Sequence, residues 1–511
     1  MLPANKTFSI EGLVSVKAMT IASLLLSAWL VAIDPLINTD AIIYLRTAEA
    51  YLTEGISASF ALFDRPTLPI AIALVHQISG LSLESTGLLL TSLAYLLLCT
   101  SFVAISKQLG GNQRVQFFAL LIILFHPIIN NYRSSIMRDP AFWALSLLSL
   151  LELLRYSHKP VIKHQIKWLI YTSLALLFRF EAILFLALAP FGLLFSMHQR
   201  LNRKVKAITH LLLPAITLTA LVLLTFKYWY GLPLKEIFPH IALYADELLS
   251  FQQHFEQVAE STGKALLRLS ATEDAIYASA AGLVGLLVLN ICRATMIPFV
   301  LILFAGRWQA LLLPIKRSEH KLILAYILIS FLYLLVFTLA NQFMLERYCT
   351  LLVILCLIYV PFILDHYWEK TSLQRRPLIR GLIVTLLVLI TMDSVHNMDY
   401  KKGYILEASR WLKQHTPPNA TLLSNNKHIA YFSNREVNWT IAQNQKLEKI
   451  LLNGIWKNYE YLAIKTKEKR YTDIASLLGY PQLKLEQYMP GGKYGGVVIL
   501  HNQLYQQSAG E

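Results

Sequence analysis

The chain has 511 residues, of which 55% are hydrophobic and only 15% are charged, and its formal net charge is +15. Its apolar residues form repeated runs of about 20, which excludes an ordinary soluble protein because soluble chains do not contain such runs. A basic chain can also bind nucleic acid, but here much of the excess Lys and Arg lies in short loops beside apolar runs. We therefore expect a membrane protein in contact with lipids, with no nucleic-acid partner.

The apolar runs predict about eleven membrane-spanning helices, and so an α-helical polytopic membrane protein. The run from Arg65 to Gly80 is short and begins with Arg65-Pro66, so we expect it to lie at the membrane surface. The approximate limits of the predicted spans are 13–33, 84–106, 114–130, 140–156, 165–179, 181–198, 207–229, 279–304, 322–340, 349–367 and 380–396.

Basic clusters alternate with acidic loops along the chain. Lys and Arg gather at 155–167, 200–206, 307–321 and 370–380. Basic loops stay in the cytoplasm, so we expect a cytoplasmic N-terminus and an external C-terminus. This topology places the acids of the remaining loops at the outer face, where we look for chemistry: Asp34, Asp40, Asp139, Glu181 and Glu346.

The predicted division is a transmembrane domain, residues 1–397, and a small extracytoplasmic α/β domain, residues 398–511. The first domain carries outer loops at 34–83 and 230–278, and in the first of these the spacing of apolar residues from Asp40 to Leu52 predicts a helix along the membrane surface. The polar tail predicts helices at 407–413 and 471–478 and strands at 421–424, 461–464 and 496–500.

Asp40 and Asp139 are the candidate catalytic residues. Each stands where a helix is expected to begin, so a helix cap is the alternative explanation for each, with Pro140 at the first helical position beside Asp139. If two acids on separate outer loops met at one site, they would hold a metal ion or activate a hydroxyl. The sequence leaves both interpretations open.

Two further charged groups interrupt apolar sequence. In Arg179-Phe180-Glu181, Arg179 is expected to pair with Glu181 or with a lipid phosphate, since charges near a membrane are costly unless they pair or act. In Glu346-Arg347-Tyr348, Arg347 suits bidentate phosphate binding. The alternative is a helix-end anchor, with Tyr348 in the aromatic belt.

Taken together, these motifs resemble the C-type superfamily of integral-membrane glycosyltransferases, and in particular the bacterial dolichyl-phosphate-mannose-type and aminoarabinose-type transferases. Each motif is loose, and the resemblance depends on their order and topology over nearly the whole chain. The motifs are Asp40-Ala41-Ile42-Ile43-Tyr44, Arg65-Pro66-Thr67-Leu68-Pro69, Arg138-Asp139-Pro140, Arg179-Phe180-Glu181-Ala182, Glu346-Arg347-Tyr348, and Trp411-Leu412-Lys413 with Pro417-Pro418-Asn419-Ala420-Thr421.

The resemblance implies transfer of a hexosyl or pentosyl sugar from a polyprenyl-phosphate donor to a lipid, glycan or protein acceptor, at the outer face of a bacterial plasma (inner) membrane. Asp40 matches the first-loop acid, a candidate base, and Asp139 matches the second-loop acid. The family often has Asp-Glu where this chain has Asp40-Ala41, so the metal ligands are unknown and a divalent cation is an open alternative. The implied substrate-binding residues are Tyr44, Arg65, Arg138, Arg179, Glu181, Glu346, Arg347 and Tyr348.

Two other functions compete with this interpretation. A lipid-linked polysaccharide ligase or polymerase would act in a similar way. A non-enzymatic lipid or glycan transporter would carry polar or broken helices at mid-membrane and often repeated halves. The sequence shows no repeated halves, and its unusual charges gather at the outer ends of the spans.

Overall fold

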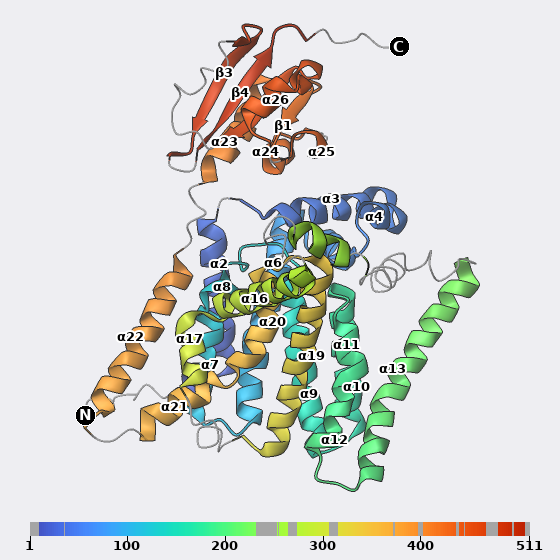
Figure 1. Cartoon of the computed structure of the whole chain (residues 1–511), viewed down its shortest axis with the longest axis vertical. Coiled ribbons are helices and arrows are strands. Elements are labelled where there is room, and N and C mark those ends of the chain that lie inside the picture. The colour runs from blue at the N-terminus through green and yellow to red at the C-terminus, as the bar shows by residue number, and fades with distance from the viewer. Residues whose placement is uncertain are drawn as a thin grey trace. The chain divides into compact units, whose positions relative to one another are not determined.

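The computed structural model (Figure 1) describes residues 10–34, 36–230, 253, 255–263, 273–305, 315–370, 374–396, 402–435, 439–443, 445–466, 479–492 and 495–505. Most of the predicted outer loop 230–278 and the predicted helix 471–478 lie outside these residues. The chain divides into two compact units. Unit 1 comprises residues 1–24, 92–130 and 138–394, and unit 2 comprises residues 25–91, 131–137 and 395–511.

Unit 1 is built from helices. Two of them, α2 (Val16–Ile33) and α6 (Leu83–Gln108), contribute several residues to each unit. The others are α1 (Ile10–Leu13), α7 (Gln113–Phe125), α8 (Pro127–Asn130), α9 (Asp139–His158), α10 (Ile162–Phe178), α11 (Ala182–Leu188), η1 (Ala189–Gly192), α12 (Leu193–Ser196), α13 (Leu201–Tyr230), α16 (Ala275–Thr295), α17 (Ile297–Phe304), α19 (Arg317–Asn341), α20 (Glu346–Leu357), α21 (Val360–Lys370) and α22 (Arg376–Val395).

The helical membrane fold predicted from the sequence is confirmed. Among the described residues, six helical stretches are long and apolar enough to cross a membrane, and many of their large apolar side chains are exposed, as expected of a surface that faces lipid. The chain is therefore an integral membrane protein, while the number of eleven spans stays a prediction. The six are Val16–Ile33, Leu83–Gln108, Ala275–Thr295, Arg317–Asn341, Glu346–Glu369 and Arg376–Val395.

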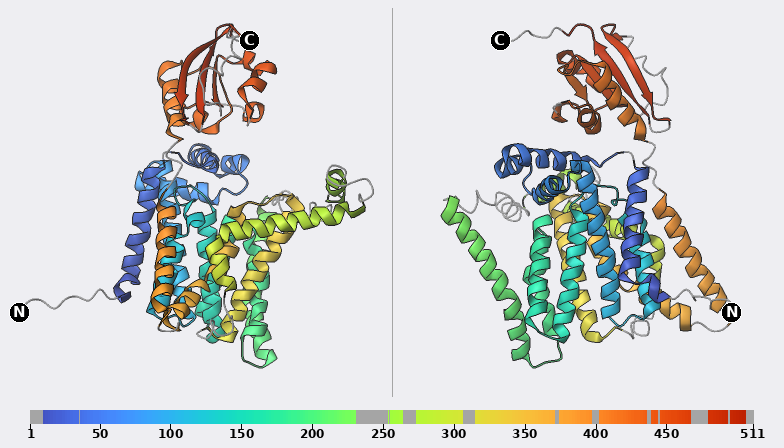
Figure 2. Two further views of the ribbon diagram at one scale, coloured as in Figure 1. Left: turned by 60° about the vertical axis from the view of Figure 1, so that its left-hand side comes forward. Right: turned by 180° about the vertical axis from the view of Figure 1, so that it is seen from behind.

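The predicted span 279–304 is not one helix. It breaks at Met296, whose φ of 69° ends α16, and α17 begins directly afterwards. Pro298 explains the break, because it has no amide hydrogen and its ring would clash with the carbonyl of residue 294 in a continuous helix. Figure 2 shows α16 running across α19 and α20, against which it packs.

Two other predicted spans are also interrupted. The run 181–198 forms α11, η1 and α12 in succession, with Pro190 at the start of η1. The run 349–367 is divided between α20 and α21, and Pro361 is the second residue of α21. Proline at the first turn of a helix is tolerated because the amide groups there have no partner within the helix.

Unit 2 combines three helices of the segment between α2 and α6 with a small α/β part. The sheet order is β1-β2-β4-β3, with β1 parallel to β2 and the other pairs antiparallel. The elements are α3 (Thr39–Glu54), α4 (Ile56–Leu62), α5 (Thr67–Ser79), α23 (Gly403–His415), β1 (Leu422–Ser424), α24 (Lys427–Phe432), α25 (Trp439–Ala442), α26 (Leu447–Leu452), η4 (Ile455–Asn458), β2 (Tyr461–Thr466), β3 (Leu483–Pro490) and β4 (Gly496–Asn502).

Both faces of this sheet are buried. Along β4, Val497 and Ile499 belong to one core cluster with α23 and α24, while Val498 and Leu500 belong to the cluster on the other face. A strand buried on both sides is a continuous apolar run, which is why β4 was predictable. Strand β3 was not predicted, because Lys484 and other polar residues interrupt its apolar pattern.

Candidate functional site

A buried ionic cluster joins two of the predicted motifs in unit 1. Asp139 is the first residue of α9, and Arg179 and Glu181 lie in the turn between α10 and α11. Arg179 donates to Glu181 Oε1 from Nε (2.9 Å) and Nη2 (2.5 Å), and from Nη1 to Asp139 Oδ1. The three side chains are at most 12% exposed. Because a buried charge is stable only with partners, each of these groups depends on the others.

Aromatic residues enclose the Arg179 guanidinium. Its Cζ lies 5.0 Å from the ring centroid of Tyr348 and 5.9 Å from that of Phe142, both within the range of cation–π attraction. Tyr333, on α19, donates its hydroxyl to Glu181 Oε1 at 2.8 Å. Glu181 Oε1 thus accepts three hydrogen bonds, which fixes the carboxylate and the guanidinium that it holds.

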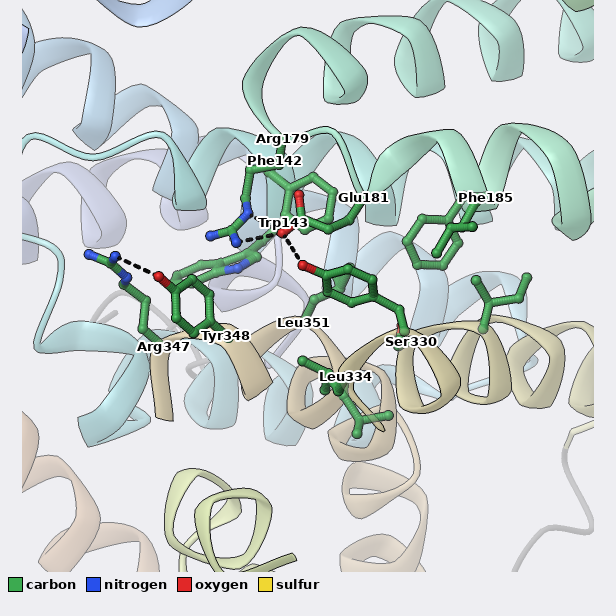
Figure 3. A pocket seen from close by; sticks show the side chains of 14 residues that line it. Phe142, Trp143, Arg179, Glu181, Phe185, Ser330, Leu334, Arg347, Tyr348 and Leu351 are labelled. Carbon is green, nitrogen blue, oxygen red and sulfur yellow. Dashed lines mark hydrogen bonds and ion pairs between the residues drawn. The ribbon is translucent and has the colours of Figure 1, made fainter. Parts of the chain in front are cut away.

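These side chains line a pocket of unit 1 (Figure 3). Its wall is formed by α9, α11, α19, α20 and the turn before α11, and it mixes aromatic faces with a few charged or hydroxyl groups. Such a composition is typical of small-molecule sites. The lining residues are Phe142, Trp143, Arg179, Glu181, Leu184, Phe185, Ile329, Ser330, Tyr333, Leu334, Arg347, Tyr348, Leu351 and Leu352.

The third predicted motif, Glu346-Arg347-Tyr348, forms the first turn of α20. Arg347 Nη2 lies 3.4 Å from the Tyr348 hydroxyl, and its Cζ lies 5.3 Å from the Tyr348 ring centroid. The Tyr348 ring is therefore in contact with two guanidinium groups, those of Arg179 and Arg347. Glu346 is half-buried, as is Arg138, the residue before α9.

The remaining predicted residues belong to unit 2. Asp40 is the second residue of α3 and is half-buried. Tyr44 is 4% exposed, and its ring lies 5.3 Å from that of Phe63, edge to face. Arg65 Nε pairs with Asp64 Oδ2 at 2.9 Å.

The structure thus gathers Asp139, Arg179, Glu181, Arg347 and Tyr348 in one unit. Asp40, Tyr44 and Arg65 lie in the other unit, so a shared site for the two candidate acids stays a prediction. Within the described ranges, no group of three or more His, Cys, Asp or Glu side chains is placed to hold a metal ion.

Sequence reasoning missed three residues of the pocket. Phe142 and Trp143 follow Asp139 by three and four positions, so they share its face of α9, a spacing that was available in the sequence. Tyr333 stands within an apolar run that gives no sign of its role, since a tyrosine in a membrane helix is ordinary.

No family model matches the chain, and no curated protein matches it. Among solved structures, the chain is similar to ArnT from Cupriavidus metallidurans in the apo state, with 12% identity over 95% of this chain and 97% of that chain and a TM-score of 0.42. The same protein bound to undecaprenyl phosphate gives 12% identity over 97% and 99%, with a TM-score of 0.40.

A second similarity is to the oligosaccharyltransferase of Archaeoglobus fulgidus, tethered with an acceptor peptide containing the NVT sequon. It has 13% identity over 94% of this chain and 74% of that chain, with a TM-score of 0.48. ArnT and the oligosaccharyltransferase are C-type membrane glycosyltransferases, the superfamily that the sequence resembles. Because these TM-scores are below 0.5, we infer function from the residues of this chain.

Proposed function

We propose that the chain is a membrane glycosyltransferase, which moves a sugar from a polyprenyl-phosphate-linked donor to a lipid, glycan or protein acceptor at the outer face of the membrane. The observation that carries the proposal is the pocket of unit 1, where the guanidinium groups of Arg179 and Arg347 lie against the Tyr348 ring beside buried carboxylates. Guanidinium groups bind phosphate oxygens, and aromatic faces with a few fixed polar groups suit a sugar.

The proposed roles follow from charge. Arg347 binds the phosphate of the donor and stabilises the polyprenyl phosphate as it leaves. Asp40 accepts the proton of the acceptor hydroxyl while that oxygen forms a bond to the anomeric carbon, and the bond from this carbon to the phosphate oxygen breaks. Asp139 is the second acid, and its ion pair with Arg179 fixes that guanidinium in the pocket.

We further propose a bacterial inner-membrane location, with the N-terminus cytoplasmic and residues 398–511 outside as a distinct extracytoplasmic domain. The Lys and Arg asymmetry of the loops supports this orientation. Reporter fusions test it. A fusion at Lys204 is expected to report the cytoplasm and one at Lys402 the outer side, and reversed signals would overturn the site assignment.

The central experiment measures transfer by the protein in liposomes, from polyprenyl-phosphate carrying a radiolabelled sugar to acceptors from the outer envelope. We expect label in the acceptor together with release of polyprenyl phosphate. Donor moved across the membrane without release of polyprenyl phosphate would instead indicate a transporter. Transfer of a preassembled polysaccharide, but not of a single sugar, would indicate a ligase or polymerase.

Asp40→Asn tests the proposed base. Asparagine has nearly the same size but cannot accept a proton, so we expect transfer to fall by about 10²–10⁴-fold at an equal level of folded protein. Glu54→Gln is the matched control, because Glu54 is an exposed acid at the other end of α3. Near-normal turnover in Asp40→Asn would remove Asp40 from the mechanism.

A further inference from the structure

The short connection between α2 and α3 is held by two distant parts of the chain. Helix α2 ends at Ile33 and α3 begins at Thr39. We call residues 36–38 the anchor segment, and all of its contacts described below lie within unit 2. Asp40, the proposed base, follows the anchor segment by two residues.

The first hold comes from the C-terminal α/β part. Leu36 is 8% exposed and belongs to the core cluster that α23, α24 and the sheet form, where its neighbours include Tyr404 and Ile429. His428, on α24, lies with Nε2 2.8 Å from the carbonyl oxygen of Ile37. Since a carbonyl only accepts, Nε2 carries the hydrogen. Asn426 caps α24 through the backbone amides of His428 and the next residue, which fixes the backbone that carries the imidazole.

The second hold comes from residues 131–137. Asn38 accepts from the amide of Ile136 at 2.8 Å and donates to the carbonyl of the same residue at 3.2 Å. Ser134 donates to Asp34 Oδ2 at 2.7 Å, while Asp34 Oδ1 accepts from the amide of Leu36 at 3.3 Å. The second outer loop is thereby bound to the start of the first.

The hydrogen bonds of Asn38 indicate that these contacts position α3. Asn38 occupies the N-cap position of α3, where an asparagine normally accepts hydrogen bonds from the first amides of its own helix, but its side chain makes no such bond. A missing cap costs a helix about 1 kcal/mol. The side chain instead makes both of its hydrogen bonds to Ile136. Asn38 thus fixes the position of α3 relative to residues 131–137 and leaves the first amides of the helix without its cap.

We propose that His428 and Asn38 are positioning residues that hold the start of α3, so that the C-terminal part of the chain sets the place of Asp40 in the transfer site. The inference rests on the proposed function, since it takes Asp40 to be the base. It predicts that loosening either hold lowers the rate of the chemical step more than the binding of donor, because a base misplaced by about 1 Å costs up to about 100-fold in rate.

Three variants of the full-length protein test the proposal. His428→Ala removes the bond to Ile37, whereas His428→Gln offers an amide hydrogen in nearly the same place. Asn38→Ser keeps a good capping residue, but the serine side chain is too short to reach Ile136. This variant therefore separates the hydrogen bonds to Ile136 from the capping of α3. His415→Ala is the matched control, because His415 is exposed and its ring contacts α23 alone.

We expect kcat to fall about 10- to 100-fold in His428→Ala and Asn38→Ser, with the KM for donor within about 2-fold of wild type. His428→Gln is expected to recover most of the rate, and His415→Ala to match wild type. Unchanged kcat in both loosened variants would overturn the proposal. Equal losses in His428→Ala and His428→Gln would overturn it for His428, since the hydrogen bond would then not be the cause.

Hydrogen exchange gives a readout that does not depend on transfer. Amides of residues 41–45 in α3 are expected to exchange faster in His428→Ala and Asn38→Ser, while those of α5 stay as in wild type. If wild-type protein transferred no sugar, the proposed function would fail, and faster exchange in α3 would still support the two holds. Unchanged exchange in α3 would refute the holds whatever the activity.

Discussion

Replacing Tyr333 by Phe removes one hydroxyl from the pocket and leaves the ring in place. That hydroxyl donates to Glu181 Oε1 at 2.8 Å, beside the two bonds from Arg179. The Glu181 side chain is only 11% exposed, so water has little access to take the place of the hydroxyl. The ring contact of Tyr333 with Phe337, at 5.9 Å, is available to Phe as well, and packing is therefore kept.

The expected loss follows from these contacts. A hydrogen bond to a charged group contributes about 1.5–3 kcal/mol, and the two bonds from Arg179 remain, so we place Tyr333→Phe at the lower end, about 1.5–2 kcal/mol of unfolding free energy. Glu181→Gln removes the charge that makes this bond strong. A double-mutant cycle between Tyr333 and Glu181 is therefore expected to give a coupling of about 1–2 kcal/mol.

Unfolding by a denaturing detergent, followed by tryptophan fluorescence in mixed micelles, measures the four free energies of this cycle. Tyr171→Phe is the matched control, because Tyr171 on α10 makes no side-chain hydrogen bond in the part of the chain that the structure describes. Independent sites add within about 0.3–0.5 kcal/mol. A coupling inside that range would show that the charge of Glu181 does not strengthen the hydrogen bond from Tyr333, and it would refute this reasoning.

Three further predictions concern single residues. Arg347→Lys is expected to keep partial transfer and Arg347→Ala to lose most of it, each with a weaker response to donor concentration, whereas a membrane anchor would leave both at wild-type rate. Arg435 is 7% exposed and donates to the carbonyls of residues 416, 418 and 420. Arg435→Lys should therefore lower the unfolding free energy of the C-terminal part by about 3 kcal/mol, measured by denaturant titration. An unchanged unfolding free energy would contradict this prediction. Burial lowers the pKa of His428 below its ordinary value of 6.5. The hydrogen bond to Ile37 raises this pKa, while the charges of Lys402, Lys465 and Lys427 lower it further. His428 therefore binds more protons in the unfolded chain, so the melting temperature should fall as the pH drops below about 6.5 towards the folded pKa. The melting temperature of His428→Gln, which lacks this group, should fall less over the same range.

The sequence predicted the charged residues of the pocket because charge within apolar runs is costly and therefore conspicuous. Arg179-Phe180-Glu181 could be read in this way, and its internal pair is confirmed. The bond from Arg179 to Asp139 could not be foreseen, since it joins residues 40 positions apart, one in the turn after α10 and the other at the start of α9. Tyr333 was out of reach for the same reason, because its partner is 152 positions away.

The fold was predictable where it depends on local pattern. Helices follow from long apolar runs, and β4 follows from its continuous apolar residues. The interruption at Met296 had a visible cause in Pro298, which a count of apolar residues alone passes over. The two hydrogen bonds between Asn38 and Ile136 had no local signal at all, since they depend on the register of two loops.

The place of Leu36 in the C-terminal core restricts the number of times that the chain crosses the membrane. Leu36 lies in the short connection after α2, and the other elements of the core that surrounds it begin at α23, after α22. Residues that pack in one core lie on the same side of the bilayer, so we expect the chain between residues 36 and 403 to cross the membrane an even number of times. The ten spans predicted between them satisfy this rule. Any revision of the topology in this interval must therefore add or remove spans in pairs.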